Sequence, residues 1–257
     1  MDANNIFCPV RFGRLVNKYI VENRSRLLLI LATPLVAMTI FALLMSDGNS
    51  REGYYTGVNN ELGFFVIMTF IFGMKLSSGA FLSMSKPKEA LASLTLPTSQ
   101  LEEFLVRWLA LVPGFMLWSV LCALFADSMR VVFTRFILHG VADFTPWCDV
   151  FTGNGGPLMW SENAFYHIVI VFMLLQSFFF LGAIVWRRNH FLKTFFVLSV
   201  IYGIYCFVAV IITRMLSWHG VGYFIMTPVV IMSVVTILIN YVLVYMRLRE
   251  SEIINRW

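Results

Sequence analysis

Lys75 is the residue of this sequence whose position most strongly suggests chemistry, because its full positive charge lies inside a long apolar segment. A lysine at the centre of a membrane costs about 2.5–3.5 kcal/mol, so such residues usually face a cavity, a bundle interior or a partner. One interpretation is that Lys75, together with Ser77 and Ser78, lines a translocation path. The other is that the long Lys75 side chain snorkels toward the cytoplasmic interface, which we expect near Met84.

Other groups that could perform chemistry are scattered along the chain. The four cysteines show no CxxC spacing, and we expect neither a disulfide nor a metal site. A GxxxxGK[ST] phosphate-binding loop does not occur, so we expect no ATP hydrolysis by this chain alone. We expect no two carboxylates to face each other within apolar segments, and no serine or cysteine there has an obvious histidine partner. The sequence therefore predicts a protein that is not an enzyme.

The composition is that of a membrane protein. Of 257 residues, 59% are apolar and only 13% are charged, whereas soluble domains have about 45–50% and about 25% respectively. The formal net charge of +5 is too small and too scattered to indicate nucleic-acid binding. These numbers favour a chain that lies mostly in lipid.

Six apolar segments are long enough to cross a membrane, which takes about 20 helical residues. Backbone groups in lipid must be hydrogen-bonded internally, so we expect helices. The sequence thus predicts an all-α, polytopic protein with a leader (residues 1–26) and a single six-span transmembrane domain (residues 27–257). The expected spans are about 27–45, 62–84, 104–126, 164–186, 191–212 and 223–246.

The distribution of lysine and arginine predicts the orientation of these spans. Of the 19, fourteen fall in the leader, the second and fourth connections with the starts of the helices that follow them, and the tail; only four fall on the other side, and Lys75 lies inside a span. By the positive-inside rule, both termini and the tail (residues 247–257) are expected in the cytoplasm, and the long loop 127–163 outside. The four on the outer side are Arg51, Arg130, Arg135 and Arg214.

The leader has the pattern of an amphipathic helix. Phe12, Leu15, Val16, Tyr19 and Ile20 recur on one helical face, with basic residues on the other. We expect this helix to lie in the cytoplasmic interface, with its basic side toward anionic lipid headgroups. The alternative is a simple cytoplasmic extension of the first span.

The connection between the second and third spans combines two helix-forming signals. Pro87 suits the first turn of a short helix that Pro97 ends. Ser99 and Glu102 then form the capping box of a new helix, in which Glu103 and Arg107 are spaced i, i+4. We therefore expect two helices, separated by a break, at the cytoplasmic membrane surface.

The stretch LTLPTSQLEEFLVR (residues 94–107), placed between the second and third of six spans and preceded by a basic amphipathic leader, resembles the membrane subunits of type-2 ATP-binding-cassette (ABC) exporters. In that family the equivalent connection is a coupling helix that docks on a separate cytoplasmic ATPase. The resemblance implies that residues 85–100 are a coupling element. The residues expected to couple to the ATPase are Lys88, Glu89, Leu91, Leu94, Pro97, Ser99, Glu102, Glu103 and Arg107.

The resemblance implies a permease subunit that exports a hydrophobic or amphipathic substrate. Its expected partners are an ABC ATPase, which would bind the ATP and magnesium, a second permease copy or paralogue, and membrane lipid, but not nucleic acid. We expect this chain to hold no cofactor and to lie in a cell membrane, of the bacterial inner-membrane type. Unlike common family members, it has its long external connection between the third and fourth spans. The alternatives are a membrane assembly protein without transport activity and, less favoured, a secondary transporter.

The orientation can be tested with a reporter that is active only in the cytoplasm. We expect activity when the reporter is fused after Arg256, and none when it is inserted near Gly155, because the charge bias places these positions on opposite sides. Activity at both positions would contradict the expected orientation.

Overall fold

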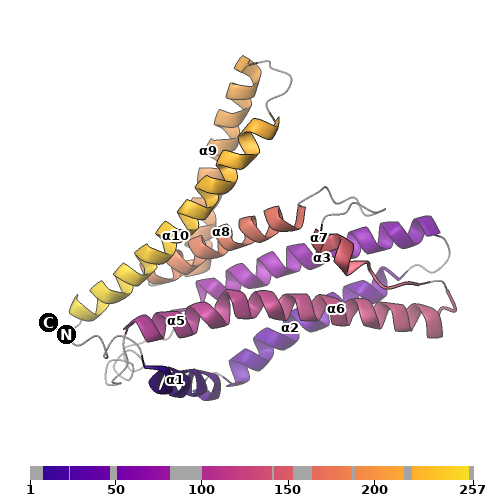
Figure 1. Cartoon of the computed structure of the whole chain (residues 1–257), viewed down its shortest axis with the longest axis horizontal. Helices are drawn as coiled ribbons and strands as arrows, with labels where there is room; N and C mark the ends of the chain where they lie inside the picture. Colours follow the sequence, from indigo (N-terminus) through magenta and orange to yellow (C-terminus); the bar gives the residue numbers. More distant parts are fainter. Residues whose placement is uncertain are drawn as a thin grey trace. The chain divides into compact units, whose positions relative to one another are not determined.

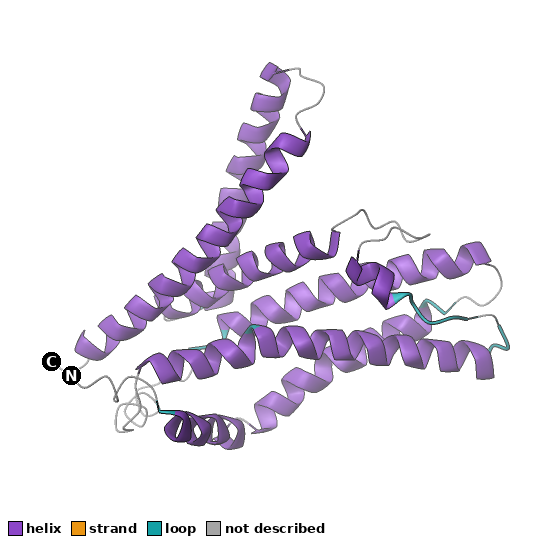
Figure 2. Ribbon diagram, in the orientation of Figure 1, coloured by secondary structure: helices purple, strands orange, loops and turns teal. Residues whose placement is uncertain are grey.

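The computed structural model describes residues 8–22, 24–46, 51–81, 100–140, 142–152, 164–186, 189–216 and 222–254 of the chain. All regular secondary structure within these ranges is helical, which confirms the all-α prediction (Figures 1 and 2). The helices are α1 (Pro9–Glu22), α2 (Arg24–Leu44), α3 (Arg51–Ser78), α5 (Gln100–Leu111), α6 (Pro113–Phe136), α7 (Trp147–Thr152), α8 (Ala164–Val185), α9 (His190–Leu216) and α10 (Gly222–Ile254).

Within the described residues, five helical segments are long and apolar enough to cross a membrane. They are Leu27–Leu44, Gly57–Ser78, Leu101–Phe136, Ala164–Val185 and Val230–Glu250. The span expected over residues 191–212 falls on α9, of which the stretch His190–Ile204 is a shorter apolar helix. A multi-pass membrane protein is thus supported, while the count of six spans stays a prediction.

Several helix ends differ from those expected from the sequence, among them the start of α3, which lies at Arg51 rather than near Leu62. α3 ends at Ser78 rather than near Met84, and α6 continues past Ala126 to Phe136. α6 extends further than expected because Asp127 and Arg130, whose polarity suggested a loop, are instead buried side chains of the helix. The first residues of the expected loop, 127–136, therefore belong to α6.

The third expected span is interrupted at Pro113, which separates α5 from α6. Proline has no N–H group, so it cannot donate to the carbonyl of Leu109. The bonds on either side persist, from Val112 N to Trp108 O at 2.9 Å and from Met116 N to Val112 O at 3.1 Å. The two helices therefore form one apolar stretch with a local break, as expected for a proline in a membrane helix.

The leader forms α1, as its periodicity predicts. Pro9 occupies the first helical position. Of the expected apolar face, Phe12, Leu15, Val16 and Tyr19 are half-buried, whereas Ile20 is exposed. α1 also contacts α2. Its position in a lipid interface stays a prediction.

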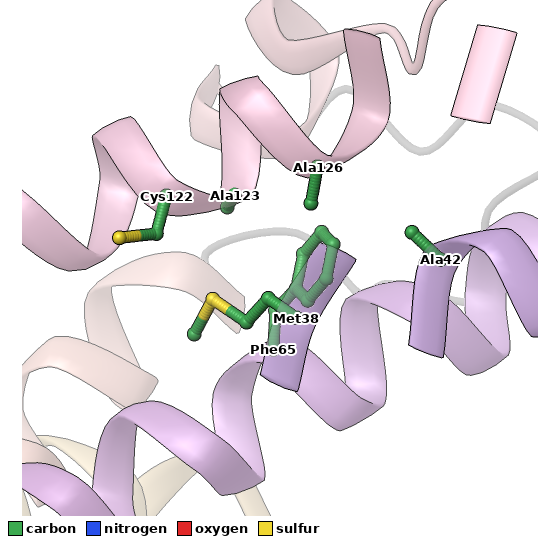
Figure 3. Packing of buried hydrophobic residues seen from close by; sticks show 6 residues of the cluster. All are labelled: Met38, Ala42, Phe65, Cys122, Ala123 and Ala126. Carbon is green, nitrogen blue, oxygen red and sulfur yellow. The ribbon is translucent and has the colours of Figure 1, made fainter. Parts of the chain in front are cut away.

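The chain divides into two compact units. Unit 1 comprises residues 1–73 and 105–169, and unit 2 comprises residues 74–104 and 170–257. In unit 1, α2 packs along α6, and Trp118 Nε1 donates a hydrogen bond of 3.1 Å to the carbonyl of Leu31. Figure 3 shows the core between α2, α3 and α6, formed by Met38, Ala42, Phe65, Cys122, Ala123 and Ala126.

In unit 2, α8 packs closely on α9 and is hydrogen-bonded to α10. The rings of Phe179 and Phe191 lie 5.2 Å apart, and Asn240 Nδ2 donates to Ser177 Oγ at 3.0 Å. Gly182 permits the close approach of α9: a Cβ at this position would overlap Thr194 Oγ1 and lie 3.0 Å from both Thr194 Cβ and Cγ2. Small residues have this role at many membrane-helix interfaces.

This close approach predicts that Gly182→Ala destabilises unit 2. Thr194 Cβ cannot move without its backbone, so α8 and α9 must separate, and we expect a loss of about 1–3 kcal/mol in the free energy of unfolding. The measurement is thermal or denaturant unfolding in detergent. Gly203→Ala in α9 is the control, because its added Cβ meets nothing within 4 Å. Equal stability of the two variants would contradict the proposed contact.

Candidate functional site

Three charged side chains meet in the interior of unit 1, and we call them the ion cluster. Glu61 lies on α3, and Asp127 and Arg130 lie on α6. Arg130 Nε is 2.7 Å from Glu61 Oε2, and Arg130 Nη2 is 2.5 Å from Asp127 Oδ1. Glu61 and Asp127 are each 1% exposed and Arg130 is 4% exposed. One guanidinium therefore joins α3 to α6 out of contact with solvent.

A loop segment, residues 142–147, is fastened to this cluster, and we call it the strap. Asp127 accepts hydrogen bonds from the Thr145 amide at 3.1 Å, from Thr145 Oγ1 at 2.9 Å and from Trp147 Nε1 at 3.1 Å. Arg130 Nη2 also donates to the carbonyl of Asp143 at 3.2 Å. The strap is thus held by the same residues that join the helices.

The chain reverses direction after α6 because of a local turn. His139 has a φ of 51°, a left-handed conformation that is uncommon for residues other than glycine. The Gly140 amide donates to the carbonyl of Thr134 at 3.1 Å, which satisfies one of the free carbonyls at the helix end. Arg135 then holds the returning strap through hydrogen bonds to Ala142 O at 2.8 Å and Asp143 Oδ1 at 3.1 Å.

Two carboxylates, each one residue outside an expected span (62–84 or 104–126), come together at Arg130, and sequence reasoning missed this arrangement. Glu61 and Asp127 both contact Arg130 within segments long enough to span a membrane. The sequence offered a weak signal, because Asp127 and Arg130 are spaced i, i+3, so they lie on one face of a helix if α6 continues past Ala126. Glu61, far away in the sequence, gave none.

The ion cluster acts as a structural site in this arrangement. Asp127 already accepts four hydrogen bonds, and all three side chains are buried, so a substrate has no direct access to them. Groups of three or more metal-binding side chains do not occur in the described parts of the chain. The cluster therefore joins helices and loop rather than presenting a catalytic pair.

Part of the expected coupling element lies outside the described residues, namely Lys88, Glu89, Leu91, Leu94, Pro97 and Ser99. The helix expected after it is present as α5, which begins at Gln100 and has Glu102 and Glu103 in its first turn. Glu102 and Arg107 are buried and Glu103 is half-buried. These three residues are thus packed against other parts of the protein, not displayed on its surface.

A cluster of aromatic rings lies at both ends of the 82–99 segment, and we call it the aromatic cluster. Phe180 of α8 is completely buried. Its ring centroid is 5.2 Å from that of Phe81 and 6.0 Å from that of Phe104, so residues on both sides of the segment contact it. Tyr241 and Tyr245 of α10 complete the cluster, against Phe180 and Phe104 respectively. Sequence reasoning missed this cluster, because aromatics are frequent throughout the chain.

The three residues of the expected translocation path do not share one surface. Lys75 is exposed in the last turn of α3, whereas Ser77 and Ser78 are buried. A cation in the last turn is favoured by the helix dipole, and because α3 ends at Ser78, Lys75 is close to the helix end. This position favours the snorkelling interpretation over a path through the interior of the chain.

Comparison with known proteins does not assign the chain to a family. No protein-family model, curated protein or solved structure matches the chain.

The ion cluster predicts that Arg130 contributes more to stability than its neighbour Arg135. Arg130→Gln leaves two buried carboxylates without their guanidinium, and we expect a loss of about 3–5 kcal/mol in the free energy of unfolding. Arg135→Gln removes an ion pair whose partners are 52% and 74% exposed, together with one hydrogen bond to the backbone. We expect a loss of no more than about 2 kcal/mol in the free energy of unfolding. Both are measured by denaturant unfolding in detergent.

A double variant tests whether the stability lost in Arg130→Gln is due to uncompensated charge. At alkaline pH, where both carboxylates are ionised, adding Glu61→Gln to Arg130→Gln removes one of the uncompensated charges, so we expect part of the stability to return. If the two arginine variants lose equal stability, or if the double variant recovers none, the assignment of the ion cluster is wrong.

Proposed function

We propose that this chain is the permease subunit of an ABC transporter of the type-2 exporter class. A separate cytoplasmic ATPase drives it through the coupling element, residues 85–100. The chain works beside a second permease copy or a paralogue in a cell membrane, and its substrate is hydrophobic or amphipathic. ATP and magnesium belong to the ATPase, and this chain supplies the membrane path.

The observation that carries this proposal is the aromatic cluster. Phe81 and Phe104 lie on either side of the 82–99 segment, and both contact the buried ring of Phe180. A force applied to the coupling element thus reaches α8 at Phe180, and reaches α10 at Tyr241 and Tyr245. Close packing makes such a contact transmit displacement, because interiors are dense and not easily compressed.

The ATPase drives the permease through its different affinities for two permease conformations. An ATPase shifts the permease between two conformations only as far as it binds them with different affinities. The coupling element is the segment through which these affinities act, with Leu91 and Leu94 as its apolar anchors and Lys88 and Glu89 as its charges. Short docked helices depend on few such anchors.

The alternative function is a membrane assembly protein that does not transport. Such a protein also needs packed apolar helices, but it does not need to bind and stimulate an ATPase. Co-purification with an ABC ATPase, and stimulation of its ATP hydrolysis, therefore separate the two functions.

The proposal predicts that Leu91→Asp together with Leu94→Asp abolishes binding and stimulation of the ATPase. The charged side chains replace apolar anchors at the expected interface, each costing about 2 kcal/mol or more of binding energy. The measurement is co-purification and ATP hydrolysis with the permease in nanodiscs. Leu91→Met together with Leu94→Met is the control: it keeps both anchors apolar and of similar volume, and should retain binding.

A further variant tests the aromatic cluster in the same assay. Phe180→Ala leaves the coupling element intact, so the ATPase should still bind while its stimulation by the permease falls.

Full binding and stimulation by the double aspartate variant, with normal membrane insertion, would contradict the coupling assignment.

A further inference from the structure

The ion cluster contains more buried carboxylates than cations. Glu61 and Asp127 are opposed by the single guanidinium of Arg130, so with both carboxylates ionised one negative charge is left over. All three side chains are at least nine-tenths buried. An uncompensated charge is strongly disfavoured away from water, and in practice such a group is neutralised or joined by a cation.

The two carboxylates are not equivalent. Asp127 accepts hydrogen bonds from Arg130, from the Thr145 amide and hydroxyl, and from Trp147 Nε1. Glu61 has one described polar contact, between its Oε2 and Arg130 Nε at 2.7 Å, and its Oε1 has no hydrogen-bond partner among the described residues. Hydrogen bonds to an ionised carboxylate stabilise the charged form. The surplus charge therefore belongs to Glu61.

Among the described residues of the surrounding elements, no second cation pairs with Glu61. On the strap, the Asp143 carboxylate is exposed and pairs with Arg135, which is itself exposed. On α7, Asp149 and Cys148 are exposed, and α2 contributes apolar side chains to the adjacent core. A bound metal ion needs several oxygen or nitrogen ligands, and the described residues contain no suitable group of them.

We propose that Glu61 is a proton-binding site, at which a carboxylic acid forms and dissociates beside the Arg130–Asp127 ion pair. The proton adds to a carboxylate oxygen of Glu61 and leaves from it to water. With the proton bound, the cluster contains one cation and one anion. Two carboxylates whose surroundings differ in this way divide their roles, one remaining ionised and the other holding the proton.

The strap is fastened beside this site, which is closed to water in the structure. Glu61 is 1% exposed, so the proton can exchange with water only when the cluster opens. The strap is bonded to Asp127 and Arg130 and, unlike α3 and α6, is not itself a long helix. The site lies wholly within unit 1, and the proposal is independent of any ATPase partner.

Infrared difference spectroscopy tests the proposal on the full chain reconstituted in lipid. Spectra recorded at acid and alkaline pH should differ by a carboxylic-acid carbonyl band that shifts in D₂O. Between near-neutral and alkaline pH, where exposed carboxylates stay ionised, we expect Glu61→Gln to lose this band, and Glu61→Asp to retain one at a shifted frequency. Asp143→Asn, which alters an exposed carboxylate of the strap, should keep the band unchanged.

Two results would overturn the proposal. The first is a set of spectra in which Glu61→Gln, folded by circular dichroism, removes no titrating carboxylic-acid band. The second is a Glu61 signal that responds to replacing choline by Na⁺ at fixed pH and ionic strength, which would assign the site to a metal cation. Because Gln has nearly the shape of Glu, and because Glu61→Asp preserves the acid, misfolding and loss of the proton site are distinguishable.

Discussion

A charge inside a membrane protein has to find its partner within the protein, and Arg130 meets this constraint by contacting Glu61 and Asp127 at once. Much of unit 1 depends on this arrangement. The guanidinium joins α3 to α6 and also reaches the strap through the carbonyl of Asp143. The helix face that carries Asp127 and Arg130 continues the line of Cys122, Ala123 and Ala126 in the apolar core. Polar and apolar contacts thus fix the same pair of helices.

Composition and periodicity were sufficient for the coarse architecture. Long apolar segments must become helices in lipid, and the amphipathic leader and the break at Pro113 follow from equally local rules. The ends of α3 and α6 were not predictable in this way. Polarity alone placed Asp127 and Arg130 in a loop, whereas their burial depends on Glu61, a partner far away in the sequence. Local spacing contains no information about such a contact.

The same limit applies to the aromatic cluster. Its members come from four separate parts of the chain, and nothing in the sequence marks Phe180 among 25 phenylalanines. Only the fold shows that Phe81 and Phe104, on either side of the 82–99 segment, meet at one buried ring. The sequence indicated where a partner would act, and the structure indicates which helices its action would reach. The two kinds of evidence are complementary because one concerns local motifs and the other long-range packing.

The central claim is that residues 85–100 contact an ABC ATPase, and site-specific photo-crosslinking in native membranes tests it most directly. A photoreactive residue would replace Leu91, and the cross-linked peptides would be identified by mass spectrometry. The proposed function predicts a cross-link to the nucleotide-binding subunit of an ABC transporter, and none from the same residue placed at exposed Leu117 on α6. Cross-links from position 91 only to lipid, or to proteins without an ATP-binding cassette, would contradict the account.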